Sequence, residues 1–154
     1  MPNVHVGFDI PTFALRVVAV RDIKAGQQLF VSYCQLDQSV NERRRQLSPY
    51  GFVCQCKACV DATSESDKVR EEWEDRLRKI VDEKAELFAN PRFDSRSIGP
   101  LLKLERDIVK EGLDFGQKFV DLLFIIFHAY GKLDNIEKEM EYFSKLNKYM
   151  GKTN

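Results

Sequence analysis

The chain has 154 residues, enough for one ordinary domain with a hydrophobic core. Its 24 lysine and arginine residues balance its 24 aspartate and glutamate residues, so the formal net charge is zero. No overall field therefore draws the protein to nucleic acid or to an anionic membrane, and neither partner is expected. The N-terminal residues lack the pattern of a signal peptide, and the longest apolar run, Leu122 to Phe127, is too short to span a bilayer. We therefore expect an intracellular protein.

The first 33 residues have the pattern of β-strands. Apolar residues alternate with polar or small ones from Val4 to Phe8, and Ala14 to Val20 is rich in β-branched residues. Leu29 to Tyr33 forms a third segment, which Lys24 to Gln27 precedes as a turn. Three strands are therefore predicted.

Helices are predicted for the rest of the chain. Ser39 and Glu42 form a capping-box pattern for a short helix that continues through Leu47 and ends before Pro49. From about residue 66 apolar residues recur at three- and four-residue steps, and further breaks divide this region into four helices. The expected helices run from about residue 66 to Asn90, from Pro100 to Gly112, from Phe115 or later to Tyr130 before Gly131, and from a cap of Asp134 and Glu137 to Tyr149. The last three indicate an antiparallel, tetratricopeptide-like array.

Three cysteines lie within six residues, at Cys54, Cys56 and Cys59. This spacing is too tight for a disulfide framework and is typical of a thiolate cluster that binds a metal. Zinc and an iron–sulfur cluster are both compatible with it, and buried structural thiols are the alternative.

The order of signals identifies a known pattern. It consists of Pro2-Asn3-Val4, an apolar strand, the turn, Ser32-Tyr33, an arginine-rich helix, and the run from Tyr50 to Cys59. This order resembles the end of a SET domain with its post-SET zinc segment, closest to the SET and MYND-domain protein-lysine methyltransferases. The resemblance covers roughly the first 60 residues.

The resemblance implies a function and a set of site residues. It implies methyl transfer from S-adenosylmethionine to the lysine of a protein substrate, histone or non-histone, in the nucleus or cytoplasm. Tyr33 matches the tyrosine that lines the lysine channel, and its hydroxyl orients the amine. Phe52 matches an aromatic that packs on the adenine of the cofactor, and Asn3 matches the end of a cofactor-contacting motif. The resemblance makes Cys54, Cys56 and Cys59 zinc ligands.

An α+β fold with a three-part division is therefore expected. Residues 1–48 would form the last strands and short helix of a SET domain, 49–61 the post-SET cysteine segment, and 62–154 the helical region. The family's upstream cofactor loop and its fourth cysteine ligand have no counterpart here, so we expect a truncated or fragmentary member that is inactive alone. Cys34 is the remaining thiol that can close the zinc shell, with water or a partner chain as alternatives.

Two other functions remain open. The first is a noncatalytic module in which the zinc segment braces helices that bind a peptide or protein. The second is a small zinc-binding transcription regulator that contacts nucleic acid through Arg43 to Arg45, which neutral net charge disfavours. These three arginines are otherwise expected to form a solvated helix face.

Overall fold

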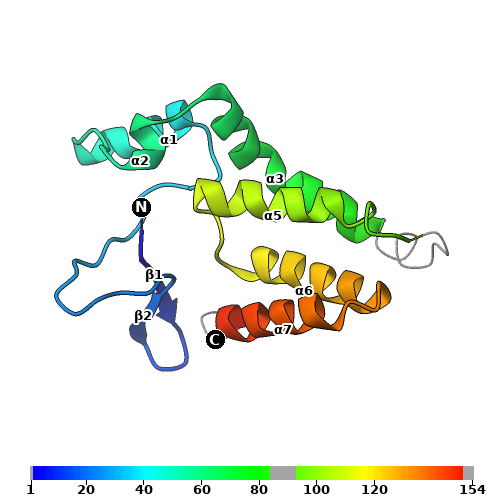
Figure 1. The fold of residues 1–154 in the computed structure, drawn as a ribbon. Coiled ribbons are helices and arrows are strands. Elements are labelled where there is room, and N and C mark those ends of the chain that lie inside the picture. Colours follow the sequence, from blue (N-terminus) through cyan, green and yellow to red (C-terminus); the bar gives the residue numbers. More distant parts are fainter. Residues whose placement is uncertain (1, 84–92, 151–154) are drawn as a thin grey trace. The chain divides into compact units, whose positions relative to one another are not determined.

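The computed structural model describes residues 2–83 and 93–150, and it divides the chain into two compact units, Met1–Asp67 and Lys68–Asn154. The first unit contains two strands and short helices, and the second is helical (Figure 1). The predicted α+β class is thus confirmed. The predicted division at residues 48 and 61 stays a prediction. The boundary between the two compact units falls between Asp67 and Lys68.

A β-hairpin opens the first unit. Strand β1 (Val4–Asp9) pairs antiparallel with β2 (Ala14–Ala19), with Val4 opposite Ala19. Because side chains alternate across a strand, one face of the hairpin gathers its apolar residues. That face is largely exposed; its members are Val6, Phe8, Leu15 and Val17.

The prediction of a third strand from Leu29 to Tyr33 is wrong. These residues form no strand, although the backbone carbonyl of Phe30 accepts hydrogen bonds from Asn3 N–H and Val4 N–H at 3.0 and 3.2 Å. The amide N–H of Phe30 is bonded to the side chain of Asn3, so the backbone ladder does not continue. The predicted turn before it is confirmed, since Gln27 N–H donates to Lys24 O at 3.0 Å.

Three short helices complete the first unit. They are α1 (Val40–Leu47), the 3-10 helix η1 (Ser48–Tyr50) and α2 (Lys57–Val60). The predicted capping box at the start of α1 does not form, because the side chain of Ser39 makes no cap hydrogen bond. Instead the carboxylate of Asp67 accepts from Val40 N–H at 2.8 Å, and so caps α1 from a distant part of the chain.

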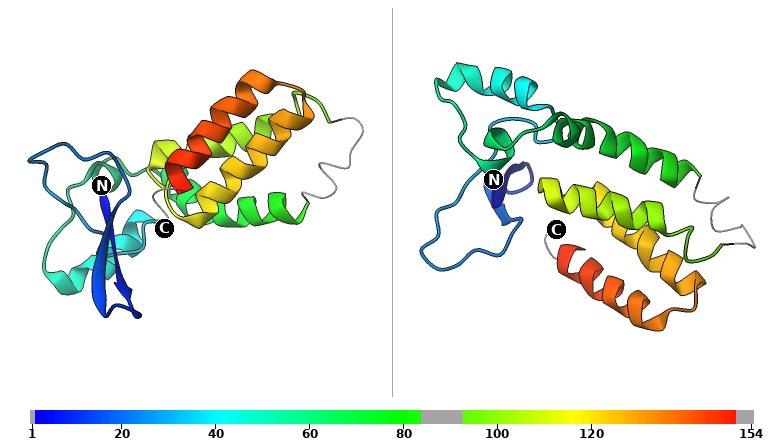
Figure 2. Two further views of the ribbon diagram at one scale, coloured as in Figure 1. Left: turned by 90° about the horizontal axis from the view of Figure 1, so that it is seen from below. Right: turned by 45° about the horizontal axis from the view of Figure 1, so that its top comes forward.

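Antiparallel helices form the second unit (Figures 1 and 2). Helix α3 (Ser64–Asp82) begins in the first unit, and α5 (Gly99–Glu111), α6 (Gln117–Lys132) and α7 (Ile136–Met150) follow, with α6 lying along both α5 and α7. Their apolar stripes form the core, which includes Trp73, Leu77, Leu104, Ile108, Phe119, Leu122, Leu123, Ile126 and Leu146. Within the described ranges, no helix combines the length and the hydrophobicity that crossing a membrane requires.

Helix ends agree with the sequence in part. Pro100 lies in the first turn of α5, and Gly112 ends it with a left-handed φ of 69°, as predicted. Helix α6, however, passes through Gly131, and the left-handed residue after it is Asp134. The side chain of Asn135, not that of Asp134, caps α7 by accepting from Lys138 N–H at 3.1 Å. The predicted helical residues Leu87 and Phe88 lie outside the described residues.

Candidate functional site

The three clustered cysteines converge as the sequence predicts. Their sulfur atoms all lie within 4.8 Å of one another. Helix α2 brings two of them together, because Cys56 is its N-cap residue and the Cys59 N–H donates to Cys56 O at 2.8 Å. Thiolates in a tetrahedral zinc site lie about 3.8 Å apart, given a Zn–S length of about 2.3 Å. The donors therefore fit three of the four positions of a zinc site with only small adjustments.

The cysteines differ in how readily they ionise. Burial raises the pKa of the Cys59 thiol to about 11, although a hydrogen bond from Arg43 opposes the shift. At Cys56 burial acts in the same direction, but hydrogen bonds from Cys54 and Cys59 outweigh it, and the pKa falls below its ordinary value. The thiol of Cys56 therefore ionises more readily than that of Cys59.

Cys34 is not part of this sulfur group. Burial raises the pKa of its thiol above the ordinary value, while a hydrogen bond from Ser32 opposes the shift. The charges of Cys54 and Cys56 also raise it, more weakly. The idea that Cys34 closes the zinc shell stays a prediction, and in the described part of the chain the cluster has three members.

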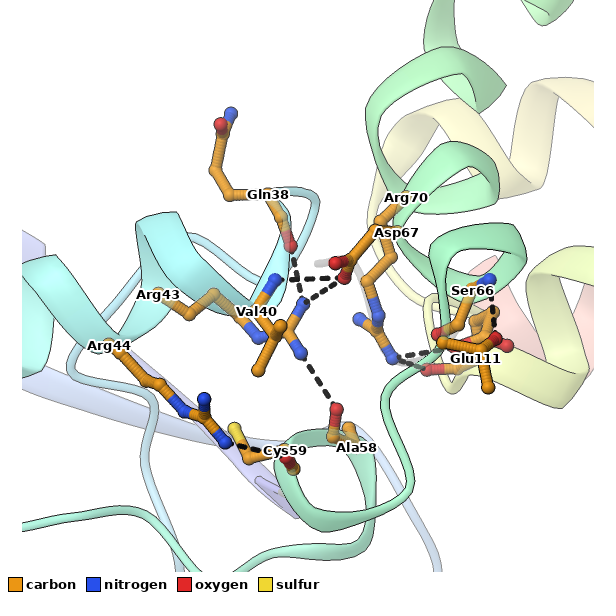
Figure 3. A network of polar contacts seen from close by, with 11 residues as sticks. Gln38, Val40, Arg43, Arg44, Ala58, Cys59, Ser66, Asp67, Arg70 and Glu111 are labelled. Atoms are coloured by element: carbon orange, nitrogen blue, oxygen red, sulfur yellow. Dashed lines mark hydrogen bonds and ion pairs between the residues drawn. The ribbon is translucent and has the colours of Figure 1, made fainter.

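The side chain of Arg43 extends from α1 toward Ala58 in α2 (Figure 3). Its side chain is only 1% exposed, so the prediction of a solvated arginine face is wrong for this residue. The guanidinium donates to the carbonyl oxygens of Gln38 and Ala58, the latter at 2.7 Å, and its Nη1 lies 4.0 Å from Asp67 Oδ1. Arg44 is exposed, yet it donates to Cys59 O at 3.4 Å.

Arg45, the third arginine of the run, is bonded to Glu42 rather than to the cysteine segment. It is exposed and pairs with Glu42 at 2.6 Å on the outer face of α1. The hydrogen bond from Arg45 lowers the pKa of the Glu42 carboxyl to about 2. Arg45 is therefore solvent-exposed, as the sequence predicts, whereas Arg43 is buried and bonded to the helix that carries Cys59.

Three exposed aromatic rings lie together in the same unit. The Tyr33 ring centroid lies 5.2 Å from that of Tyr50 and 6.5 Å from that of Phe52. Their exposed fractions are 56%, 57% and 44%, respectively. Apolar rings usually bury themselves, so three exposed rings in contact make a surface that is suited to binding. We refer to Tyr33, Tyr50 and Phe52 as the aromatic cluster.

Sequence reasoning assigned two of these rings and missed Tyr50. A signal was present, because Gly51 separates Tyr50 from Phe52 and ends η1 with a left-handed φ of 70°. Glycine adopts this conformation without the steric cost of a Cβ. The turn lets both rings approach Tyr33, which lies 17 residues earlier in the sequence.

The side chain of Asn3 is buried and bonded to the backbone. It is 4% exposed, and its side-chain amide donates to Gln28 O at 2.9 Å while its carbonyl accepts from Phe30 N–H at 2.7 Å. Both ends of the amide are thus bonded to the backbone that leads to Tyr33. Contact between Asn3 and a cofactor stays a prediction.

Comparisons with known proteins agree with the resemblance. The chain is 42% identical over 55 residues to histone-lysine N-methyltransferase SET5 of Meyerozyma guilliermondii, which covers 35% of this chain and 11% of the relative. It is 36% identical over 76 residues to protein-lysine N-trimethyltransferase SMYD5 of Homo sapiens, covering 47% and 18%. It is 35% identical over 91 residues to histone-lysine N-methyltransferase SMYD3 of Homo sapiens, covering 54% and 21%.

No protein-family model matches the chain. The matched segments span only 11 to 21% of the length of these three relatives. Over about half of its length, this chain is nevertheless similar to the SET and SMYD lysine methyltransferases, which confirms the resemblance inferred from its motifs.

Proposed function

We propose that this chain contributes the lysine-facing and cofactor-facing surface of a SET-type protein-lysine methyltransferase. The observation that carries the proposal is the aromatic cluster, in which the two residues assigned from the resemblance, Tyr33 and Phe52, lie 6.5 Å apart by ring centroid. Relatives named histone-lysine methyltransferases make histones the first substrates to test, and hence the nucleus a place of action. The SET fold itself and a tetratricopeptide-like arrangement of the helices are part of this proposal.

The side chains suit the chemistry. S-adenosylmethionine supplies an electrophilic methyl group on a sulfonium, and a neutral lysine amine must approach it in line. The hydroxyl of Tyr33 can orient that amine, because a phenol stays protonated at neutral pH and so offers a fixed dipole. The rings of Tyr33 and Tyr50 offer faces that attract a cationic methylammonium. Phe52 offers a face on which an adenine can stack.

The cysteine cluster would hold zinc in a structural role. Cys54, Cys56 and Cys59 supply three thiolates, and a structural site needs a fourth ligand. Only Val53 separates Cys54 from Phe52, so a metal that fixes the cysteine also restrains the neighbouring ring. Elemental analysis and titration with a chromogenic chelator measure the zinc content. Both should find about one zinc ion per chain if the proposal is correct.

Cofactor binding provides the first functional test. We expect calorimetry on the zinc-loaded chain to detect S-adenosylmethionine, and Phe52→Ala to weaken its affinity about 5- to 150-fold, because base stacking contributes about 1–3 kcal/mol. Phe13→Ala is the matched control, since Phe13 is an exposed aromatic of the hairpin outside the aromatic cluster. Absence of cofactor binding by the chain, or equal loss in both variants, would contradict the proposal.

Methyl transfer provides the second functional test. With a radiolabelled donor and a mixture of histone and non-histone proteins, Tyr33→Phe removes only the hydroxyl and is expected to lower the rate by tenfold or more, with little effect on cofactor affinity. Tyr50→Phe separates the two tyrosines, since its ring stays in place. A zinc-loaded chain that binds the cofactor but methylates no protein would leave the catalytic proposal without support and favour the alternative below.

A second candidate function is protein interaction by the helical unit. A cleft of about 520 Å³ lies along α5 and α7, and its lining contains more basic than acidic residues. Its charged members are Arg106, Lys110, Lys138, Lys145, Glu105 and Glu141. An acidic peptide would complement this excess. This function would be supported by salt-sensitive binding of such a peptide. Lys110→Glu should abolish the binding, whereas Lys103→Glu, on the same helix but outside the cleft, should leave it intact.

A further inference from the structure

Arg43 is buried to a degree that is unusual for an arginine. A guanidinium removed from water costs several kcal/mol unless its donors are bonded, so such residues persist only where they make several strong contacts. Arg43 makes them with three separated parts of the chain: Gln38 before α1, Ala58 in α2 and Asp67 in the first turn of α3. Nothing in the sequence distinguishes it from its neighbours Arg44 and Arg45.

The contacts concentrate on the cysteine segment. Ala58 lies between Cys56 and Cys59, and its carbonyl accepts from Arg43 Nη2 at 2.7 Å. This bond holds the peptide group that links Ala58 to Cys59. The next residue, Arg44, donates to the Cys59 carbonyl at 3.4 Å. The short helix α2, which has only four residues, is therefore fastened to α1 by its own carbonyl groups (Figure 3).

Asp67 completes the arrangement. Its carboxylate accepts from Val40 N–H at 2.8 Å and lies 4.0 Å from the Arg43 guanidinium. The aspartate thereby fixes both the start of α1 and one side of the guanidinium. The other arm of the guanidinium, Nη2, faces α2 and donates to the carbonyl of Ala58.

The charge also matches a metal cluster. Three thiolates and one zinc ion carry a net charge of about −1, and a fourth thiolate would make it about −2. A buried cation beside such a cluster offsets this charge, and hydrogen bonds around the ligands orient them. A guanidinium suits this task, because its planar fork binds two acceptors at fixed directions, whereas an ammonium is a single point of charge.

We propose that Arg43 is the positioning residue of the zinc site, holding Cys59 and the α2 backbone in the geometry that the metal requires. The inference rests on the proposed zinc site at Cys54, Cys56 and Cys59. Arg43 does not touch the metal itself. It acts through the carbonyl of Ala58, the residue that precedes Cys59, and Asp67 sets its direction.

Zinc affinity tests this role directly. Competition with a chromogenic chelator is expected to show about 10- to 100-fold weaker binding for Arg43→Met, the usual effect of losing a partner of a metal ligand. Arg43→Lys keeps the charge but cannot span both carbonyls, so we expect a smaller loss in the same direction. The matched control is Arg45→Met on the same helix, which removes an exposed arginine and should leave zinc affinity unchanged.

Cobalt provides a readout that general destabilisation would not change. Cobalt(II) bound by thiolates has visible absorption bands that depend on ligand geometry, and we expect Arg43→Lys to shift these bands while Arg45→Met reproduces the wild-type spectrum. Should Arg43→Met fail to fold, judged by circular dichroism, Arg43→Lys and Asp67→Asn carry the test. Asp67→Asn keeps the acceptor for Val40 N–H but removes the charge beside Arg43.

The outcomes separate the two proposals. Failure of the wild-type chain to bind zinc refutes the zinc site, and with it the role of Arg43. Alternatively, the wild-type chain binds zinc tightly, while a folded Arg43→Lys or Arg43→Met variant keeps the wild-type zinc affinity and cobalt spectrum. That result refutes the role of Arg43 but leaves the zinc site standing. Weaker binding with an unaltered cobalt spectrum and a parallel loss of helix content also refutes it, because Arg43 would then only stabilise the fold.

Discussion

Replacing Asn3 by alanine tests how the chain positions Tyr33. The wild-type side chain donates to Gln28 O at 2.9 Å and accepts from Phe30 N–H at 2.7 Å, so the substitution removes two hydrogen bonds. Each bond contributes about 0.5–1.5 kcal/mol, and partly buried groups left without a partner add to the cost. We therefore expect local opening of residues 28–30 to become easier by about 2–3 kcal/mol.

Amide hydrogen exchange resolved by residue measures this opening. A change of 2–3 kcal/mol corresponds to about a 30- to 150-fold faster exchange of the Phe30 amide, because 1.4 kcal/mol is a factor of ten. The Val20 amide, which donates to the Asn3 backbone carbonyl at 3.0 Å, shows how far the loosening extends. His5→Ala, at an exposed position of β1, is the control.

A graded variant sharpens the test. Asn3→Asp keeps an acceptor for Phe30 N–H and loses the donor to Gln28 O, so its effect should fall between those of wild type and alanine. Exchange of the Phe30 amide at the wild-type rate in a folded Asn3→Ala chain would refute the reasoning. In that case the segment that leads to Tyr33 would be held by something other than this side chain.

Two further predictions concern the helical unit. Glu111→Ala leaves the buried guanidinium of Arg70 with the Glu111 backbone carbonyl but without the carboxylate 3.0 Å away, and we expect it to lower the free energy of unfolding by about 3 kcal/mol. Urea unfolding followed by the fluorescence of buried Trp73 measures this, and a change below about 1 kcal/mol would contradict it. Burial and a hydrogen bond to Glu105 raise the pKa of Tyr142, so above about pH 10 the unfolded chain holds fewer protons than the folded one. Stability should therefore fall with rising pH more steeply in wild type than in Tyr142→Phe, and equal slopes would show that Tyr142 does not contribute.

Local patterns predicted the elements whose partners are close in sequence. The first strand followed from alternation between Val4 and Phe8, and α5 followed from Pro100 at its start and Gly112 at its end. These signals depend on the geometry of a few adjacent residues. The sequence alone is therefore sufficient to predict these elements.

Errors arose where distant residues replace a local partner. Asp67 caps α1 from 27 residues away, so the capping pattern at Ser39 was misleading. Arg43 is buried only because Gln38, Ala58 and Asp67 surround it, and no feature of an arginine run reports such an environment. In α7 two apolar stripes overlap, and the structure buries Tyr142 and Leu146.

The other stripe of α7 remains on the surface. Ile136, Met140 and Phe143 recur at three- and four-residue steps, yet they are 71%, 58% and 47% exposed. The Phe143 ring lies 6.1 Å from that of Phe127 on α6, so part of this face continues onto the neighbouring helix. Periodicity identifies an apolar stripe but cannot tell which of two stripes meets the core.

The convergence of Cys54, Cys56 and Cys59 was predictable because these residues are close in sequence. Tyr50, Phe52 and the three cysteines lie within ten residues, and a single short segment fixes both the aromatic rings and the thiols. Movement of Cys54 necessarily moves Phe52, two residues away. If the proposed function is correct, a metal that orders the cysteines would reduce the entropy that Phe52 must lose when an adenine stacks on it, and by linkage the cofactor would favour the metal to the same extent. Arg43 would enter this coupling from outside the segment, which is why the motif predicts the ligands but not the residue proposed to hold them.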